Sequence, residues 1–267
     1  MANSINTNRG ALVALQTLNN TNKALETTQN RVNTGLKVSS AKDNGAIFAI
    51  ATSQRAEMGA QDAVKQSLQR GQSIVDVALA AGETVVDALT ELKSLAVAIQ
   101  DADPTGETAT KLNADFTAIV NEITSAIDGA TFDGVNLFTA TTATEVSTNT
   151  SGGKFELGDG TVVNPVTGGG ADLAATANRT AANVDDAISA FTTVLADFGT
   201  KSKSLDRQLT FVGKMQDALE TGVGNLVDAD LAKESARLTA LQTKQQLGVQ
   251  ALSIANSSSS MLLGLFR

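Results

Sequence analysis

Apolar side chains recur at alternating steps of three and four residues along two long stretches of the chain. The first stretch holds Val64, Leu68, Gly71, Val75, Ala78, Gly82, Val85, Leu89, Leu92, Ala96 and Ile99. The second holds Ile188, Phe191, Leu195, Phe198, Ser202, Leu205, Leu209, Val212, Gln216, Leu219, Val223 and Leu226. This spacing is typical of coiled-coil seams. It predicts two helices of roughly 53 and 57 Å that lie side by side, and the glycines allow a partner helix to approach closely.

A shorter periodic segment at about 108–128 predicts a third helix. The segment 101–106, which contains Pro104, supplies the turn that precedes it. Helical periodicity then stops, and Gly, Thr, Ser and Asn dominate an insertion at about 129–182.

Within this insertion, Gly158-Asp159-Gly160 separates two short β-prone segments, 155–157 and 161–163. This arrangement predicts a hairpin. The Thr/Ser-rich segment 139–153 and the glycine run 168–170 are expected to be loops.

Both ends of the chain carry apolar residues on two helical faces. Near the N-terminus, one stripe holds Ile5, Leu12 and Leu15, and the other holds Leu18, Leu25 and Val32, with Thr21 and Thr28 between them. Near the C-terminus, one stripe holds Leu231, Leu238, Leu241, Leu252, Ala255 and Leu262, and the other holds Leu247, Ala251, Ile254, Met261 and Leu265. A helix with two apolar faces needs more than one partner. One face is therefore expected to pair with the opposite terminus and the other with a neighbouring molecule. The alternative is a C-terminal helix that folds back onto its own bundle.

These patterns predict a mainly α fold, an elongated antiparallel coiled-coil bundle formed by both chain ends, with a small β-rich hairpin insertion. Segments 1–40 and 228–267 are expected to form a terminal coiled-coil domain. Segment 41–227 is expected to form an outer helical-bundle domain that carries the insertion.

Composition excludes much chemistry. The chain has no His and no Cys, which removes imidazole bases, thiol nucleophiles and the usual zinc ligands. Carboxylate pairs such as Asp185-Asp186 have no second catalytic signal beside them, and Asp228 with Asp230 suits the start of a helix. We therefore expect no catalytic, cofactor or metal site, and no enzyme.

The formal net charge is −8, without a cluster of Lys or Arg, so nucleic acid and anionic membranes are poor partners. No apolar run reaches the length of a membrane span, and the first thirty residues lack a signal-peptide core. The protein is expected to stay in the cytoplasm or to be exported without a cleaved signal peptide.

Two local features concern the segment after the N-terminal helix. Asp43-Asn44-Gly45 predicts a turn, because Asn and Gly tolerate positive φ. Arg31, Lys37, Lys42 and Arg55 are expected to pair with acids of the C-terminal half or of a neighbour.

Several short segments, in one order at both ends of the chain, resemble bacterial flagellin. They are Ile5-Asn6-Thr7-Asn8, RVNTGLKVSSAKDNGA at 31–46, Gly71-Gln72-Ser73-Ile74, Leu95-Ala96-Val97, Phe132-Asp133-Gly134-Val135-Asn136-Leu137, VDADLAKESARL at 227–238, QALSIAN at 250–256 and the LFR ending. The resemblance covers about 1–138 and 183–267.

The resemblance implies a structural subunit that self-assembles into the flagellar filament, with the terminal helices lining its core. The expected polymerisation residues are Ile5, Leu12, Leu15, Leu18, Leu25, Val32, Leu238, Leu241, Leu252, Ile254, Leu262, Leu265 and Phe266. The implied partners are further copies of the chain, the flagellar export apparatus, an export chaperone, and the filament cap and hook-junction proteins. The implied location is the extracellular flagellum.

Two surface properties follow from comparison with the family. The positions that match the family's immune-receptor patch are Glu91, Leu95 and Asp115; only Leu95 agrees, so weak receptor activation is expected. The Thr/Ser-rich loop could carry O-glycans, or it could be unmodified. Its candidate sites are Thr139, Thr141, Thr142, Thr144, Ser147 and Thr148.

Two alternative functions remain. A hook–filament junction protein shares similar termini, although the SAKDNGA segment and the LFR ending favour flagellin. A coiled-coil signalling or scaffold protein would explain the long seams but not the two-faced termini.

Overall fold

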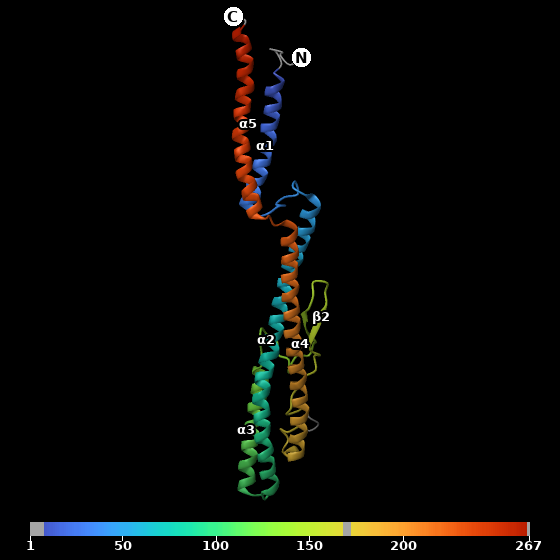
Figure 1. Ribbon diagram of the computed structural model, residues 1–267. Helices are drawn as coiled ribbons and strands as arrows, with labels where there is room; N and C mark the ends of the chain where they lie inside the picture. The colour runs from blue at the N-terminus through green and yellow to red at the C-terminus, as the bar shows by residue number, and fades with distance from the viewer. Residues whose placement is uncertain (1–7, 168–171, 266–267) are drawn as a thin grey trace. The chain divides into compact units, whose positions relative to one another are not determined.

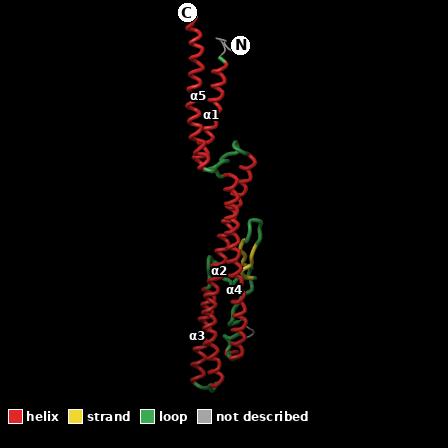
Figure 2. The backbone as a smooth tube through the Cα atoms, viewed as in Figure 1, coloured by secondary structure: helices red, strands yellow, loops and turns green. Residues whose placement is uncertain are grey.

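A computed structural model describes residues 8–167 and 172–265, with the backbone alone from residue 258 onward. The helices are α1 (Arg9–Thr34), α2 (Gly45–Asp101), α3 (Glu107–Gly129), the 3₁₀ turn η1 (Thr176–Asn178), α4 (Ala181–Val227) and α5 (Leu231–Leu265). The strands are β1 (Thr144–Ser147) and β2 (Lys154–Gly158). Figures 1 and 2 show how far helix dominates these residues. The mainly α helical bundle predicted from the sequence is confirmed.

The described chain divides into two compact units. The terminal unit combines the residues up to Ala56 with those from Ala218 onward, and the central unit comprises Glu57–Asp217. Helices α2 and α4 each continue from one unit into the other.

The two predicted seams form the core of the central unit. On α2, every seam residue from Val64 to Ala96 is buried. Three polar pairs cross from α2 to α4, namely Asp62 with Gln216 at 2.7 Å, Gln72 with Asp206 at 2.6 Å and Lys93 with Asp185 at 2.7 Å. In each pair the two residue numbers add to 278, so the helices run antiparallel in one unbroken register. The predicted side-by-side packing is confirmed.

The two seam glycines of α2 receive different partners. A Cβ at Gly82 would collide with the side chain of Leu195 on α4, so this glycine allows the helices to approach, as predicted. A Cβ at Gly71 would lie 2.8 Å from Val146 Cγ1. Strand β1 of the hairpin therefore packs against Gly71. The prediction that a partner helix packs there is wrong.

Helix α3 confirms the third periodic segment. The preceding turn ends at Gly106, which is the N-cap of α3. The face of α3 that carries Phe116, Val120, Ile123 and Ile127 is buried in the same core as the α2 and α4 seams. Phe138 completes this core, and its ring lies 5.4 Å from Phe191 and 5.7 Å from Phe198, measured between centroids.

The hairpin exists, and its predicted strand at 155–157 is confirmed within β2, but the predicted second strand at 161–163 and the predicted turn at 158–160 are wrong. Strand β2 pairs antiparallel with β1, and Val146 lies opposite Phe155. The turn is built around Asn149, whose Oδ1 accepts the N–H groups of Ser151 and Gly153 at 3.0 and 2.6 Å. Segment 139–153, expected to be a loop, thus supplies a strand. Its β-branched Thr and Val residues suit a strand, and the polar composition concealed this signal.

Asn44 precedes α2 and caps it. Its Oδ1 accepts the N–H of Ile47 at 3.1 Å, which satisfies one free donor of the first turn. Neither Asn44 nor Gly45 has positive φ. The expected turn is present, but the positive-φ explanation is wrong, because the capping geometry uses the asparagine side chain instead. The predicted loop at 168–170 lies outside the described residues.

Candidate functional site

Helices α1 and α5 pair antiparallel in the terminal unit. Asn8 caps α1 by accepting the N–H of Ala11 at 3.0 Å, and its Nδ2 donates to the carbonyl of Ala255 at 2.7 Å. Gly35, at φ 71°, ends α1 in the left-handed conformation. Asp230 caps α5 by accepting the N–H of Lys233 at 3.1 Å, which agrees with the expected place of this acid at a helix start.

The facing sides of the two helices carry one apolar stripe each. On α1, Leu18, Leu25 and Val32 are half-buried, and Thr21 and Thr28 between them are buried. The facing stripe of α5 consists of half-buried Leu238, Leu241, Leu252 and Ala255. Leu231 was predicted in this stripe but is 49% exposed, because it is the first residue of the helix.

The second stripe of each helix is exposed to solvent. On α1, Leu12 and Leu15 are 57% and 44% exposed. On α5, Leu247 and Ile254 are 61% and 66% exposed. The two-faced pattern read from the sequence therefore corresponds to one face that packs within the chain and one that does not.

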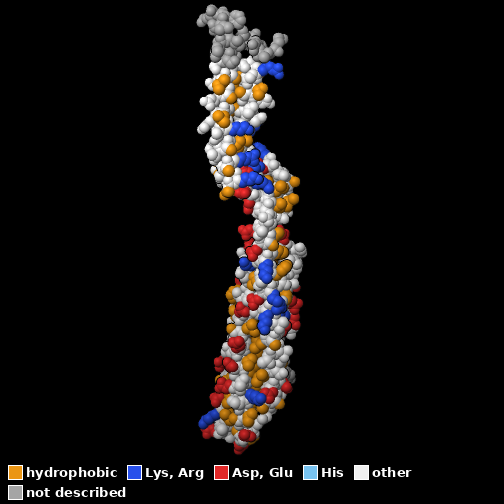
Figure 3. Space-filling view, in the orientation of Figure 1, with side chains coloured by type: hydrophobic (Ala, Val, Ile, Leu, Met, Phe, Trp, Pro, Cys, Tyr) orange, Lys and Arg blue, Asp and Glu red, His pale blue; other side chains and the backbone are white. Residues whose placement is uncertain are grey.

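Four of the predicted interface residues cannot be placed in this way. Ile5 and Phe266 lie outside the described residues, and for Leu262 and Leu265 only the helical backbone of α5 is described. Figure 3 shows that the α1–α5 surface carries hydrophobic side chains among uncharged polar ones, with few charges. A surface of this composition can gain free energy chiefly by burial against another apolar surface.

One ion pair closes the base of the α1–α5 pair. Arg31 Nη1 lies 3.1 Å from Glu234 Oε1, and Glu234 is buried. Among the four cations expected to pair with acids, Arg31 does so. Lys37, Lys42 and Arg55 form no ion pair with any other residue that the structure describes.

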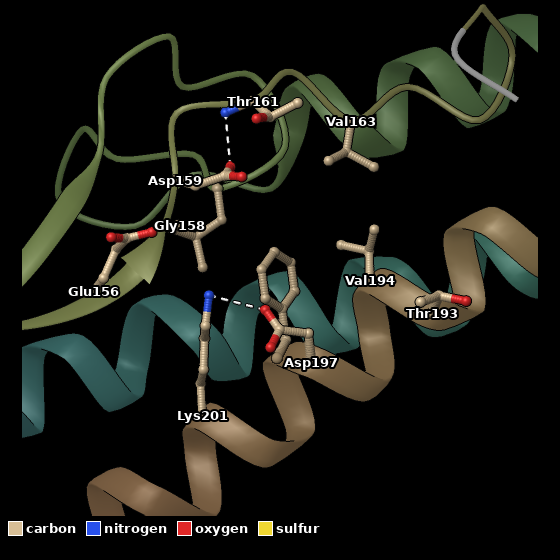
Figure 4. Close-up of a pocket in the computed structure, with 11 residues that line it drawn as sticks. Glu156, Gly158, Asp159, Thr161, Val163, Thr193, Val194, Asp197 and Lys201 are labelled. Carbon is tan, nitrogen blue, oxygen red and sulfur yellow. Dashed lines mark hydrogen bonds and ion pairs between the residues drawn. The ribbon is translucent and has the colours of Figure 1, made fainter.

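The central unit contains a cavity of about 350 Å³ beside the end of β2 (Figure 4). Lys201 Nζ occupies its polar side, pairing with Asp197 at 2.8 Å and donating to the carbonyl of Leu157 at 3.2 Å. The Thr161 N–H, which donates to Asp159, lowers the pKa of that carboxyl. Lys201, Asp197 and Asp159 thus each have a hydrogen-bonding partner, and the side chain of Glu156 also lines the cavity. No sequence pattern indicates this cavity, because segment 158–160 resembles a hairpin turn.

Arg179 is a second feature that the sequence analysis missed. Its side chain is buried, lies 5.0 Å over the Phe116 ring and donates to acceptors of Asn113, Thr117 and Ala174. No carboxylate among the described residues pairs with it, and burial lowers the pKa of its guanidinium. A single arginine in a loop gives no periodic signal, so spacing could not have found it.

The remaining predicted surface sites lie on the central unit. Glu91 and Asp115 are exposed and Leu95 is half-buried. The candidate glycosylation residues divide into exposed and half-exposed positions, namely Thr139, Thr141, Thr142 and Ser147, and Thr144 and Thr148. Receptor activation and glycosylation stay predictions.

Among the described residues, no helix has the length and apolar character needed to cross a bilayer. Nor do these residues bring together three acidic, His or Cys side chains that could hold a metal ion.

Long paired helices closed by both chain ends, with exposed apolar stripes among the described residues, define a protein of the elongated helical-bundle class. Residues 5–143 match the bacterial flagellin N-terminal helical region, and residues 181–266 match the bacterial flagellin C-terminal helical region. The chain belongs to the bacterial flagellin family, a family of structural proteins.

Individual relatives match over almost the whole chain. Flagellin FljM of Caulobacter vibrioides is 52% identical, with 99% of both chains covered. The flagellin of Brucella melitensis is 41% identical, again with 99% of both covered. A crystal structure of Bacillus cereus flagellin aligns with a TM-score of 0.46 and 20% identity over 55% of this chain and 88% of that one. The sequence matches make this chain a subunit of the flagellar filament.

Proposed function

We propose that the exposed stripes of α1 and α5 are the surfaces by which this flagellin polymerises, with both terminal helices lining the filament core. The observation that carries the proposal is the division of α5 into two apolar faces. Leu241 and Leu252 face α1, whereas Leu247 and Ile254 are 61% and 66% exposed. Water-exposed leucine and isoleucine on a face with few charges are the expected mark of an assembly surface.

The gain from burying this face can be placed in order of magnitude. Complete burial of a Leu or Ile side chain contributes about 1.5–3 kcal/mol. Because Leu247 and Ile254 each expose about two thirds of their surface, burial on assembly should contribute roughly 1–2 kcal/mol per residue. Ordering the partner helices opposes this gain, so filament growth should be cooperative and should need a seed.

The test replaces one exposed apolar residue by a charged one. In Leu247→Asp, a carboxylate would have to be buried at the interface, so addition of subunits to filament seeds should stop. Gln246→Asp is the matched control, because Gln246 is also exposed on α5 but lies outside the apolar stripe. Sedimentation and electron microscopy of seeded mixtures would measure elongation.

The expected result is normal elongation with wild type and Gln246→Asp, and none with Leu247→Asp. Equal elongation by both variants would show that this stripe does not form the contact. Circular dichroism of the monomers tests folding, since both changes lie on an exposed surface and should leave the helix content of the central unit unchanged.

The same proposal covers the location of the subunit and the proteins that it meets. The assembled subunit lies outside the cell in the flagellum, exported without a cleaved signal peptide. The flagellar export apparatus and an export chaperone would handle the unassembled chain, and filament cap and hook-junction proteins would contact the filament ends. The matches along the whole chain to proteins named flagellin favour this function over that of a hook–filament junction protein.

A further inference from the structure

Helix α4 carries a basic stripe on its exposed surface. Its members are Lys203, Arg207, Phe211 and Lys214, which follow one another at steps of four, four and three residues. All four are exposed, and Phe211 exposes 60% of its surface, an unusual value for so large an aromatic side chain. None of the three cations forms an ion pair with another described residue.

Helix α2 carries an acidic stripe that spans the same number of residues as the basic stripe. Its members are Asp76, Ala80, Glu83 and Asp87, at steps of four, three and four residues. These residues are exposed, and their three carboxylates likewise form no ion pair within the described chain. Ala80 is the one uncharged member of the acidic stripe, as Phe211 is of the basic stripe.

The two stripes match residue by residue when the helices are laid antiparallel. The opposed pairs are Lys214 with Asp76, Phe211 with Ala80, Arg207 with Glu83 and Lys203 with Asp87. The residue numbers of these pairs add to 290 or 291, whereas α2 and α4 of one chain pack in the register that adds to 278. The stripes of one chain therefore lie about twelve residues, or roughly 18 Å, out of register with each other.

We infer that the basic stripe of α4 binds the acidic stripe of α2 in a second copy of the chain. This inference rests on the proposed polymerisation and names a lateral contact within it. Because α2 and α4 run antiparallel in each subunit, two subunits that point the same way place α4 of one antiparallel to α2 of the other. The neighbour is displaced along the helices by roughly 18 Å.

The chemistry of the contact is mixed. Surface ion pairs are individually weak and screened by salt, so the row of three pairs supplies register and specificity more than affinity. Phe211 would bury its ring on the methyl of Ala80 between two ion pairs, and this apolar contact is insensitive to salt. A slide by one helical turn would set Lys214 against Ala80 and Phe211 against Glu83, which loses ion pairs and the apolar contact, so the matched displacement is favoured.

A disulfide can test this register directly, because the chain has no Cys. In Ala80→Cys/Phe211→Cys, assembled filaments exposed to a mild oxidant should give a ladder of covalent multimers on a non-reducing gel. Within one chain the two positions are about thirteen residues out of register, roughly 20 Å, which is too far for a disulfide. Each single Cys variant is the control and should give no ladder.

A charge exchange tests the energetics. Arg207→Glu should raise the critical concentration for seeded elongation at least fivefold, and Arg207→Glu/Glu83→Arg should restore it to within about twofold of wild type. Lys111→Glu reverses an exposed cation of α3 outside both stripes and should change little.

The outcomes separate this inference from the proposed function. If wild-type protein does not elongate seeds at all, polymerisation itself fails. If wild type elongates but the double-Cys filaments give no ladder, the inferred register is overturned. Normal elongation by Arg207→Glu, or a loss that Glu83→Arg does not restore, likewise overturns the charge pairing. A ladder together with rescue supports it.

Discussion

Replacing Arg179 by Met should destabilise the central unit more than any change to an exposed arginine, although Arg179 has no carboxylate partner in the described chain. The guanidinium holds the loop before α4 against α3 by donating to Asn113 O and Oδ1 at 2.7 and 2.9 Å, to Thr117 Oγ1 at 2.9 Å and to Ala174 O at 3.1 Å. Methionine fills a similar volume but donates nothing.

The expected loss of stability follows from the hydrogen-bond acceptors that would remain without the guanidinium donor. The Thr117 hydroxyl keeps a partner, since it donates to Asn113 O at 2.8 Å. Asn113 Oδ1 and Ala174 O lose the donor that Arg179 supplied, at about 1–3 kcal/mol each. Loss of the cation over the Phe116 ring adds about 0.5–2 kcal/mol. Release of a buried charge from its desolvation penalty offsets part of this total, so the expected net loss is about 2–4 kcal/mol.

Thermal unfolding of the monomer, followed by circular dichroism, measures the effect. A loss of 2–4 kcal/mol lowers the Tm of a unit of this size by about 5–15 °C. Arg70→Met is the matched control. It breaks the ion pair with Asp133 at 3.2 Å, but both side chains are more than half exposed, so the loss should stay below about 1 kcal/mol. If Arg179→Met melts with wild type, or if Arg70→Met costs as much, the hydrogen-bond argument is refuted.

Two further predictions concern single positions. Gly160→Ala should destabilise the insertion by about 1–3 kcal/mol, because Gly160 has φ 81° and a Cβ there would lie 2.8 Å from the Thr142 carbonyl carbon. Gly199→Ala on α4, where a Cβ meets open space, should instead stabilise the protein by up to about 1 kcal/mol. Urea unfolding of both variants would show whether the two changes in stability have opposite signs. The pKa of Asp43 is lowered by N–H and hydroxyl donors of Ser40 and Ser39. The ionised carboxylate should therefore protect the amides of this turn from hydrogen exchange above the unfolded-state pKa. This protection should be lost as the pH falls through the lower folded-state pKa. Hydrogen exchange of the Ser39 and Ser40 amides against pH should show this acid-side loss in wild type and not in Asp43→Asn.

The helices were predictable because their signal is periodic and repeated. Each seam step from Val64 to Ile99 adds an independent apolar position, and burial of one helical side enforces that pattern. The division of α5 into two faces was predictable for the same reason, since Leu241 and Leu252 differ from Leu247 and Ile254 only in their angular position on the helix.

The insertion was less predictable because its contacts are single and non-local. The buried residue of strand β1 is Val146, and it packs against Gly71 of α2, which is distant in the sequence. Gly160 was interpreted as part of a hairpin turn, whereas it allows the chain to cross close to Thr142 and Ala143. Arg179 donates hydrogen bonds to carbonyl groups of α3 and of its own loop. Every residue has a backbone carbonyl group, so the sequence does not indicate which of them accept a hydrogen bond.

The unbroken register of α2 against α4 couples the lengths of two segments that are distant in the chain. Adding one residue to α2 between Asp62 and Lys93 would rotate every later side chain by about 100° around the helix, so the pairs with Gln216, Asp206 and Asp185 could no longer all form in one register. A change of length in one helix therefore needs a compensating change in the other. The turn at Asn149–Gly153 meets α2 through an exposed hydrogen bond from Thr150 Oγ1 to Glu57 Oε1 at 2.7 Å, and no helix register depends on it, so evolution can lengthen or shorten the insertion there while the helical frame stays constant in length.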